Sequence, residues 1–149
     1  MRTALALFAV AALSGCSAQQ LASIYCGSPP PTSNNPVVPQ LLYPVPSITG
    51  VPDNAQALVV AYALSPYTAF PVVITPRGGA HIQLPGFAAP PHPLPQPMAK
   101  EITPGAPLYG IALPSLQSHT AYSVAYRDTV SYCGRTFVNY YNMGSFTTK

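Results

Sequence analysis

Residues able to do acid, base or nucleophilic chemistry are few in this 149-residue chain, and they lie far apart. A triad of His119, Asp128 and a serine such as Ser123 would need the fold to bring them together, and no nucleophile elbow or comparable motif accompanies them. Asp53 lies in a Pro-Asp-Asn turn signature. The histidines show none of the short spacings of zinc sites. We therefore expect no catalytic site, metal or cofactor, and a hydrolase with a cryptic site is the least favoured alternative.

The start of the chain has the pattern of a secretory leader. One basic residue, Arg2, precedes the apolar run Ala4–Leu13. This run is too short to cross about 30 Å of hydrocarbon as a permanent helix. We therefore expect residues 1–15 to be a signal peptide.

The next residues place one cysteine in a setting suited to acylation. Residues 13–16, Leu-Ser-Gly-Cys, resemble the lipobox of bacterial lipoproteins, whose cysteine is acylated and becomes the mature N-terminus. The resemblance implies a lipid on Cys16, and several acyl chains attach stably at about 0.8 kcal/mol per buried methylene. Ser17 follows, which by analogy with Gram-negative sorting implies the outer membrane in such an organism. An ordinary cleaved leader is the alternative.

The two other cysteines, Cys26 and Cys133, remain if lipid occupies Cys16. Two thiols in an oxidising compartment predict a disulfide. A bond that closes the long loop between Cys26 and Cys133 would stabilise the fold by up to about 4 to 5 kcal/mol in the chain-entropy model. Two separate buried thiols are the alternative.

Proline divides the rest of the chain. A first Pro-rich stretch predicts an extended, lipid-anchored tether over residues 16–42, since it can form neither helix nor central strand. A second stretch predicts a long loop over residues 85–107 inside one domain, 43–149.

The domain shows period-2 or short apolar runs and no sustained helical period. Two of these runs, separated by Pro-Arg-Gly-Gly at 76–79, predict a hairpin in which glycine supplies a positive φ. Strands separated by turn signals in this way favour an all-β, antiparallel sandwich. The expected strands are Gln56–Leu64, Val72–Thr75, Ala80–Leu84, Leu108–Leu113, Ala121–Tyr126 and one within Tyr140–Thr148.

One segment of the domain resembles a known family. Leu116 precedes Tyr122 by six positions, as the leucine and tyrosine do before the sixth strand of fibronectin type III domains, which are immunoglobulin-like sandwiches. The resemblance implies a tyrosine corner, in which the ring of Tyr122 packs into the core and its hydroxyl satisfies a backbone group in the preceding turn. Gly144–Thr148 is similar to the family's closing strand. The chain lacks the family's usual tryptophan, for which Tyr62 can substitute.

Three tyrosines near the end of the chain form a candidate binding region. Tyr132, Tyr140 and Tyr141 flank Cys133, with asparagines beside them. Such side chains could recognise a protein or a glycan, although ordinary cross-strand pairing is the favoured interpretation.

Charge limits the class of partner. Only 6% of the residues are charged, and no Lys/Arg cluster could follow a phosphate backbone, so we expect no nucleic-acid partner. We expect a non-catalytic lipoprotein of the cell envelope whose domain serves adhesion, scaffolding or protein interaction. A glycan- or peptide-binding module using the Tyr132–Tyr141 region is the alternative.

Overall fold

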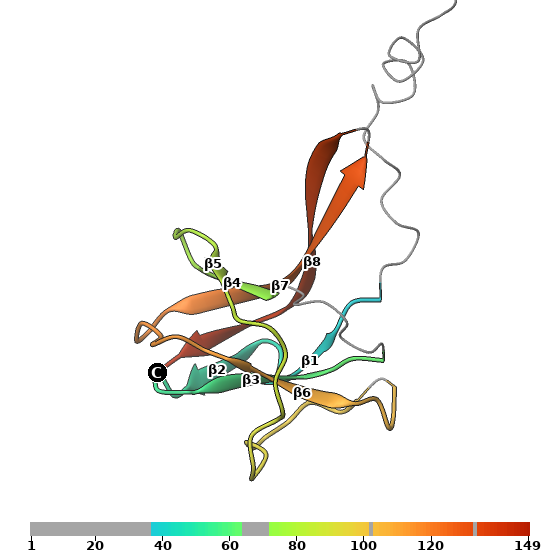
Figure 1. The fold of residues 1–149 in the computed structure, drawn as a ribbon. Coiled ribbons are helices and arrows are strands. Elements are labelled where there is room, and N and C mark those ends of the chain that lie inside the picture. Colours follow the sequence, from blue (N-terminus) through green and yellow to red (C-terminus); the bar gives the residue numbers. More distant parts are fainter. Residues whose placement is uncertain (1–36, 64–71, 102, 133) are drawn as a thin grey trace, which may run out of the picture.

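A computed structural model describes residues 37–63, 72–101, 103–132 and 134–149 (Figure 1). The expected signal peptide, Cys16, Cys26, Cys133 and the tether as far as residue 36 lie outside these ranges. All the regular elements in the described ranges are strands, and these ranges contain no helix that could cross a membrane. The expectation of an all-β fold is confirmed.

The strands form two sheets with one parallel pair. A three-stranded sheet has the order β1-β3-β6, and a five-stranded sheet has the order β2-β8-β7-β4-β5. The expectation of a wholly antiparallel fold is wrong, because β2 pairs with β8 in parallel. The bounds are β1 Gln40–Tyr43, β2 Ile48–Val51, β3 Ala57–Ala61, β4 Val72–Pro76, β5 Ile82–Gln83, β6 Leu108–Ala112, β7 Ala121–Tyr132 and β8 Arg135–Thr148.

The two sheets bury one apolar core between them. Because side chains alternate along a strand, β7 directs Tyr122, Val124 and Tyr126 inward while Ser123 stays exposed. Leu58 and Val60 of β3 enter the same core from the other sheet. A shared core of this kind is consistent with a β-sandwich.

The predicted hairpin is confirmed. Ile74 of β4 pairs with Ile82 of β5, and the amide of Gly79 donates to the carbonyl of Pro76 over 2.9 Å. Gly78 has a φ of 76°, which a type II turn requires at this position and which glycine adopts without steric cost.

Two strands lie where none was expected. β1 begins at Gln40, within the range assigned to the tether, and its Leu41 and Leu42 are buried. β2 follows after the prolines at 44 and 46. Prolines flank both short strands, and before β1 this composition led us to expect an extended tether as far as residue 42.

The Pro-rich stretch over residues 85–107 packs against the three-stranded sheet at both of its edges. Ala88 exchanges two backbone hydrogen bonds with Gly110 of β6, at 2.8 and 3.0 Å. The amide of Ala99 donates to the carbonyl of Leu42 in β1 over 2.8 Å. Near Gly110 the stretch lies on the side of the sheet away from the core, because Ala89 and Pro90 lie where a Cβ of Gly110 would point, whereas the neighbouring Ile111 enters the core. The stretch thereby occupies backbone groups of both edge strands, where unpaired groups would invite other chains.

Candidate functional site

The far halves of β7 and β8 project from the sandwich as a two-stranded arm (Figure 1). β4 pairs with β7 only as far as Tyr126, whereas β7 and β8 continue to pair up to Tyr132 and Arg135. We call residues Arg127–Tyr132 and Arg135–Tyr140 the arm. An isolated two-stranded ribbon is marginally stable in water, so the arm depends on the sandwich that carries it.

The two faces of the arm differ. One face continues the exposed side of the five-stranded sheet and bears Val138, 38% exposed, and Tyr140, 46% exposed. The other continues the core side, and its Val130 and Phe137, which are paired, are half-buried. We call these the outer and inner faces. The two faces differ because side chains alternate between the two sides of each strand, and this alternation continues from the sandwich into the arm.

Tyrosine hydroxyls gather at the base of the arm on its inner face. Tyr126, 5% exposed, pairs with Tyr141, and their ring centroids lie 6.2 Å apart. Tyr62, which follows β3 in the other sheet, shares a hydrogen bond with the hydroxyl of Tyr126. We call these three residues the tyrosine cluster.

Burial and nearby charge keep the phenols of Tyr62 and Tyr126 neutral. Burial is the main reason why the pKa of Tyr126 is raised to about 12. The nearby Tyr62, Asp128 and Tyr141 also raise it. Burial and then Asp128 also raise the pKa of Tyr62, against the hydrogen bond with Tyr126, which lowers it. At neutral pH these hydroxyls therefore act as hydrogen-bonding groups and not as phenolates.

The predicted binding tyrosines divide between the two faces. Tyr141 lies inward at the base, and its hydroxyl is buried without a hydrogen-bond partner. Tyr140 lies outward and stacks on His81, with ring centroids 4.7 Å apart. The Nδ1 atom of His81 shares a 2.6 Å hydrogen bond with the hydroxyl of Thr75. The backbone of Tyr132 closes β7, and its side chain lies outside the described part.

Tyr122 lies at the opposite end of the molecule from the arm's tip. Its ring is 2% exposed and stacks on Phe146 at 5.3 Å, and its hydroxyl accepts the backbone N–H of Gln117 over 2.8 Å. Leu116 is buried in the same core. The side chain thus connects the core to the turn before β7.

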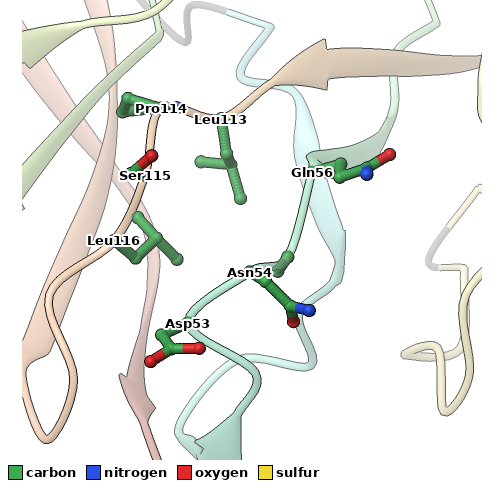
Figure 2. Close-up of a pocket in the computed structure, with 8 residues that line it drawn as sticks. Asp53, Asn54, Gln56, Leu113, Pro114, Ser115 and Leu116 are labelled. Atoms are coloured by element: carbon green, nitrogen blue, oxygen red, sulfur yellow. The ribbon is translucent and has the colours of Figure 1, made fainter.

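A shallow pocket of about 420 Å³ lies between the start of β3 and the end of β6 (Figure 2). Leu113 and Leu116 point into it. Asp53 is the charged side chain of its lining, and its carboxylate accepts the hydroxyl of Ser118 over 2.6 Å. The interpretation of Asp53 as a turn residue is confirmed, because Ala55 N–H donates to the carbonyl of Pro52 over 3.0 Å. Polar groups of turn residues line the pocket, and they are not arranged as a catalytic site.

The triad weighed from the sequence is not assembled. His119 lies in the turn before β7 and Asp128 in the arm, so an extended strand separates them by roughly 30 Å at about 3.3 Å per residue. Ser123 points to the exposed side of its sheet. In the part of the chain that the structure describes, no three His, Cys, Asp or Glu side chains are grouped to hold a metal.

Two features of this region were not predicted. The strand was expected to end at Tyr126, although the alternation continues through Val130, and this continuation was the available signal. The contacts of Tyr62 with Tyr126 and of His81 with Tyr140 could not be foreseen, because both depend on how strands are placed.

No family model matches the chain, and no curated protein matches it.

Proposed function

We propose that this chain is a non-catalytic lipoprotein of the cell envelope, anchored through Cys16, whose domain serves adhesion, scaffolding or protein interaction. In a Gram-negative organism its membrane is the outer one. The observation that carries the interaction role is the arm, a two-stranded ribbon that presents Val138 and Tyr140 to solvent beyond the sandwich. Tyrosine is enriched at protein interfaces and among the residues that carry most of the binding energy.

The domain is proposed to be of the fibronectin type III kind. The packing of two sheets over one core supports this assignment, since fibronectin type III domains share the sandwich architecture. The hydrogen bond from Gln117 to the hydroxyl of Tyr122 has the geometry of a tyrosine corner. The Pro-rich stretch over 85–107 is this chain's departure from the family.

The tether and the disulfide complete the proposal. Residues 16–36 carry the domain away from the lipid, and Cys26 is bonded to Cys133 at the arm's tip. The positions of the flanking residues support a cysteine at the tip, because Tyr132 pairs with Arg135 and leaves a two-residue connection.

Photo-crosslinking in living cells tests the interaction role. A benzoylphenylalanine at Val138 is expected to form adducts with an envelope protein, while the same group at Ala112, which is exposed on the other sheet, serves as control. Identical adducts from both positions, or none from Val138, would contradict the proposal.

A glycan- or peptide-binding module remains the second candidate. The exposed Tyr140 ring stacked on His81 favours it, because a ring held in place by a neighbour offers a flat surface for a sugar. Co-sedimentation with purified cell-wall polysaccharide separates the two candidates. The glycan role predicts retention that falls about tenfold in Tyr140→Ser and is unchanged in Asn54→Ser, a change in an exposed turn residue.

A further inference from the structure

In the arm, β8 is paired on one of its two sides. β7 lies along that side from Arg135 to Thr147. Among the described residues, no strand pairs with the other side of residues 136–142, and β2 pairs there only from Phe146 onward. We call residues 136–142 the free edge. Backbone N–H and C=O groups along such an edge are open to another extended strand.

The other described sheet edges each carry a feature that hinders pairing with another chain. The Pro-rich stretch bonds to the backbone of β1 and β6. β5 has two residues, and β2 has four residues between the prolines at 46 and 52. The side of β7 that extends beyond β4 begins with the charged residues Arg127 and Asp128. Covering segments, short length, proline and charge are the usual means by which proteins keep sheet edges from pairing.

The free edge of β8 has none of these features. Residues 136–142 are Thr-Phe-Val-Asn-Tyr-Tyr-Asn, with no charged residue and no proline. Threonine, valine and the aromatic residues of this run favour strands. Val138 and Tyr140 are also exposed. A long, uncharged edge of this composition favours pairing with another strand.

The sequence of the free edge is complementary to a second copy of itself. When two copies pair antiparallel about a twofold axis at Asn139, Val138 lies opposite Tyr140 of the second copy on the outer face. On the inner face, Phe137 lies opposite Tyr141 of the second copy. Aromatic rings opposite β-branched or aromatic side chains stabilise a sheet. Moving the axis by one residue would place Asn139 opposite Phe137 or Tyr141, so the side chains specify one register.

The shape and charge of the arm permit this pairing. The arm projects from the sandwich (Figure 1), and antiparallel pairing places each sandwich beyond the tip of the other copy's arm. Arg135, the charged residue of β8, lies outside the paired run, so no like charges face each other. At the other end, the register shift that skips Met143 ends the regular run before β2 begins to pair.

We infer that two copies of this chain pair through the free edges of β8 and join their five-stranded sheets into one continuous sheet. Backbone hydrogen bonds between the edges supply the affinity, and the cross-strand side-chain pairs fix the register. A twofold contact of this kind uses the same surface on both copies and closes as a dimer. The inference deepens the proposed interaction role, on which it rests, by naming a second copy as the partner.

Photo-crosslinking of two differently tagged, full-length copies in the same membrane tests the pairing. Thr129 provides the matched control, because it pairs with Val138 and is exposed on the same face, but lies on the strand away from the free edge. Benzoylphenylalanine at Val138 is expected to join the two tags through residues 136–142 of the second copy. At Thr129 the yield should be about tenfold lower.

The other outcomes separate this inference from the proposed function. Adducts of Val138 with a different protein alone would overturn the pairing and leave the proposed interaction role standing. Adducts within the same molecule alone, or none, would overturn both. Equal joining of the two tags from Val138 and Thr129 would overturn the pairing through the free edge.

A charge placed on the free edge gives a second measurement. Val138→Lys adds the kind of residue that keeps edges from pairing, and Thr129→Lys adds the same charge on β7. Co-purification of the two tags from detergent extract is expected to fall about tenfold in Val138→Lys and less than about twofold in Thr129→Lys. Equal co-purification in both variants and the unaltered chain would overturn the inference.

Discussion

Tyr122 joins the turn before β7 to the core through a single hydroxyl. Tyr122→Phe removes the acceptor for the backbone N–H of Gln117 and is expected to lower the free energy of unfolding by about 1 kcal/mol. Tyr140→Phe is the control, because that ring is exposed, and is expected to change stability by less than about 0.5 kcal/mol. Urea unfolding measures both. Equal effects would show that the corner hydroxyl does not stabilise the turn.

Tyr126 makes stability depend on alkaline pH. Its folded pKa of about 12 lies above the ordinary value of 10, so between these values the unfolded chain releases a proton that the folded chain retains. The contribution of Tyr126 to the free energy of unfolding is therefore expected to be constant below pH 10 and to be lost as pH rises to about 12. Tyr126→Phe should flatten this decline relative to the unaltered chain. Urea midpoints between pH 9 and pH 12 test it, and equal slopes in the two chains would contradict the assignment.

Contacts within a few residues were the ones that sequence could predict. The Tyr122 hydroxyl bonds a group five residues away, in the turn that its motif indicates. The Asp53 turn was predictable for the same reason. The contact between Tyr62 and Tyr126 joins two sheets, and no local pattern specifies which residues two sheets bring together.

At the level of elements, Gly110 is where the Pro-rich stretch approaches β6 most closely. A Cβ at this position would lie 2.7 Å from the carbonyl oxygen of Ala89. Gly110→Ala is therefore expected to lower stability by about 1 to 3 kcal/mol, because backbone must shift. Ala112→Val, on the same face but exposed, should change it by less than about 0.5 kcal/mol. Thermal unfolding compares them, and a neutral Gly110→Ala would mean that the stretch is not held against the sheet.

Alternation and turn chemistry predicted the elements whose burial differs by face. β7 and the β4–β5 hairpin were found this way. β1 and β2 were missed because neighbouring prolines resemble a linker, and only pairing with β3 and β8 makes them strands. The arm was missed because the charged residues Arg127 and Asp128 resemble the end of a strand. In the structure both are paired within the β7–β8 ladder.

At the level of the whole molecule, the account predicts the state of every cysteine. With lipid on Cys16 and a bond between Cys26 and Cys133, as proposed, the denatured chain from membranes should show no free thiol before reduction and two after it. Cys26→Ser should expose one thiol without reduction, which would be Cys133. Two titratable thiols in the unaltered, unreduced chain would contradict the disulfide.

The intact mass of the chain extracted from membranes tests the proposed anchor at Cys16. We expect a chain that begins at Cys16 and carries a diacylglyceryl group on sulfur with an N-linked acyl chain. Cys16→Ala should yield neither the lipid nor that N-terminus. An unaltered chain that retains residues 1–15, or that is cleaved but carries no lipid, would contradict the account.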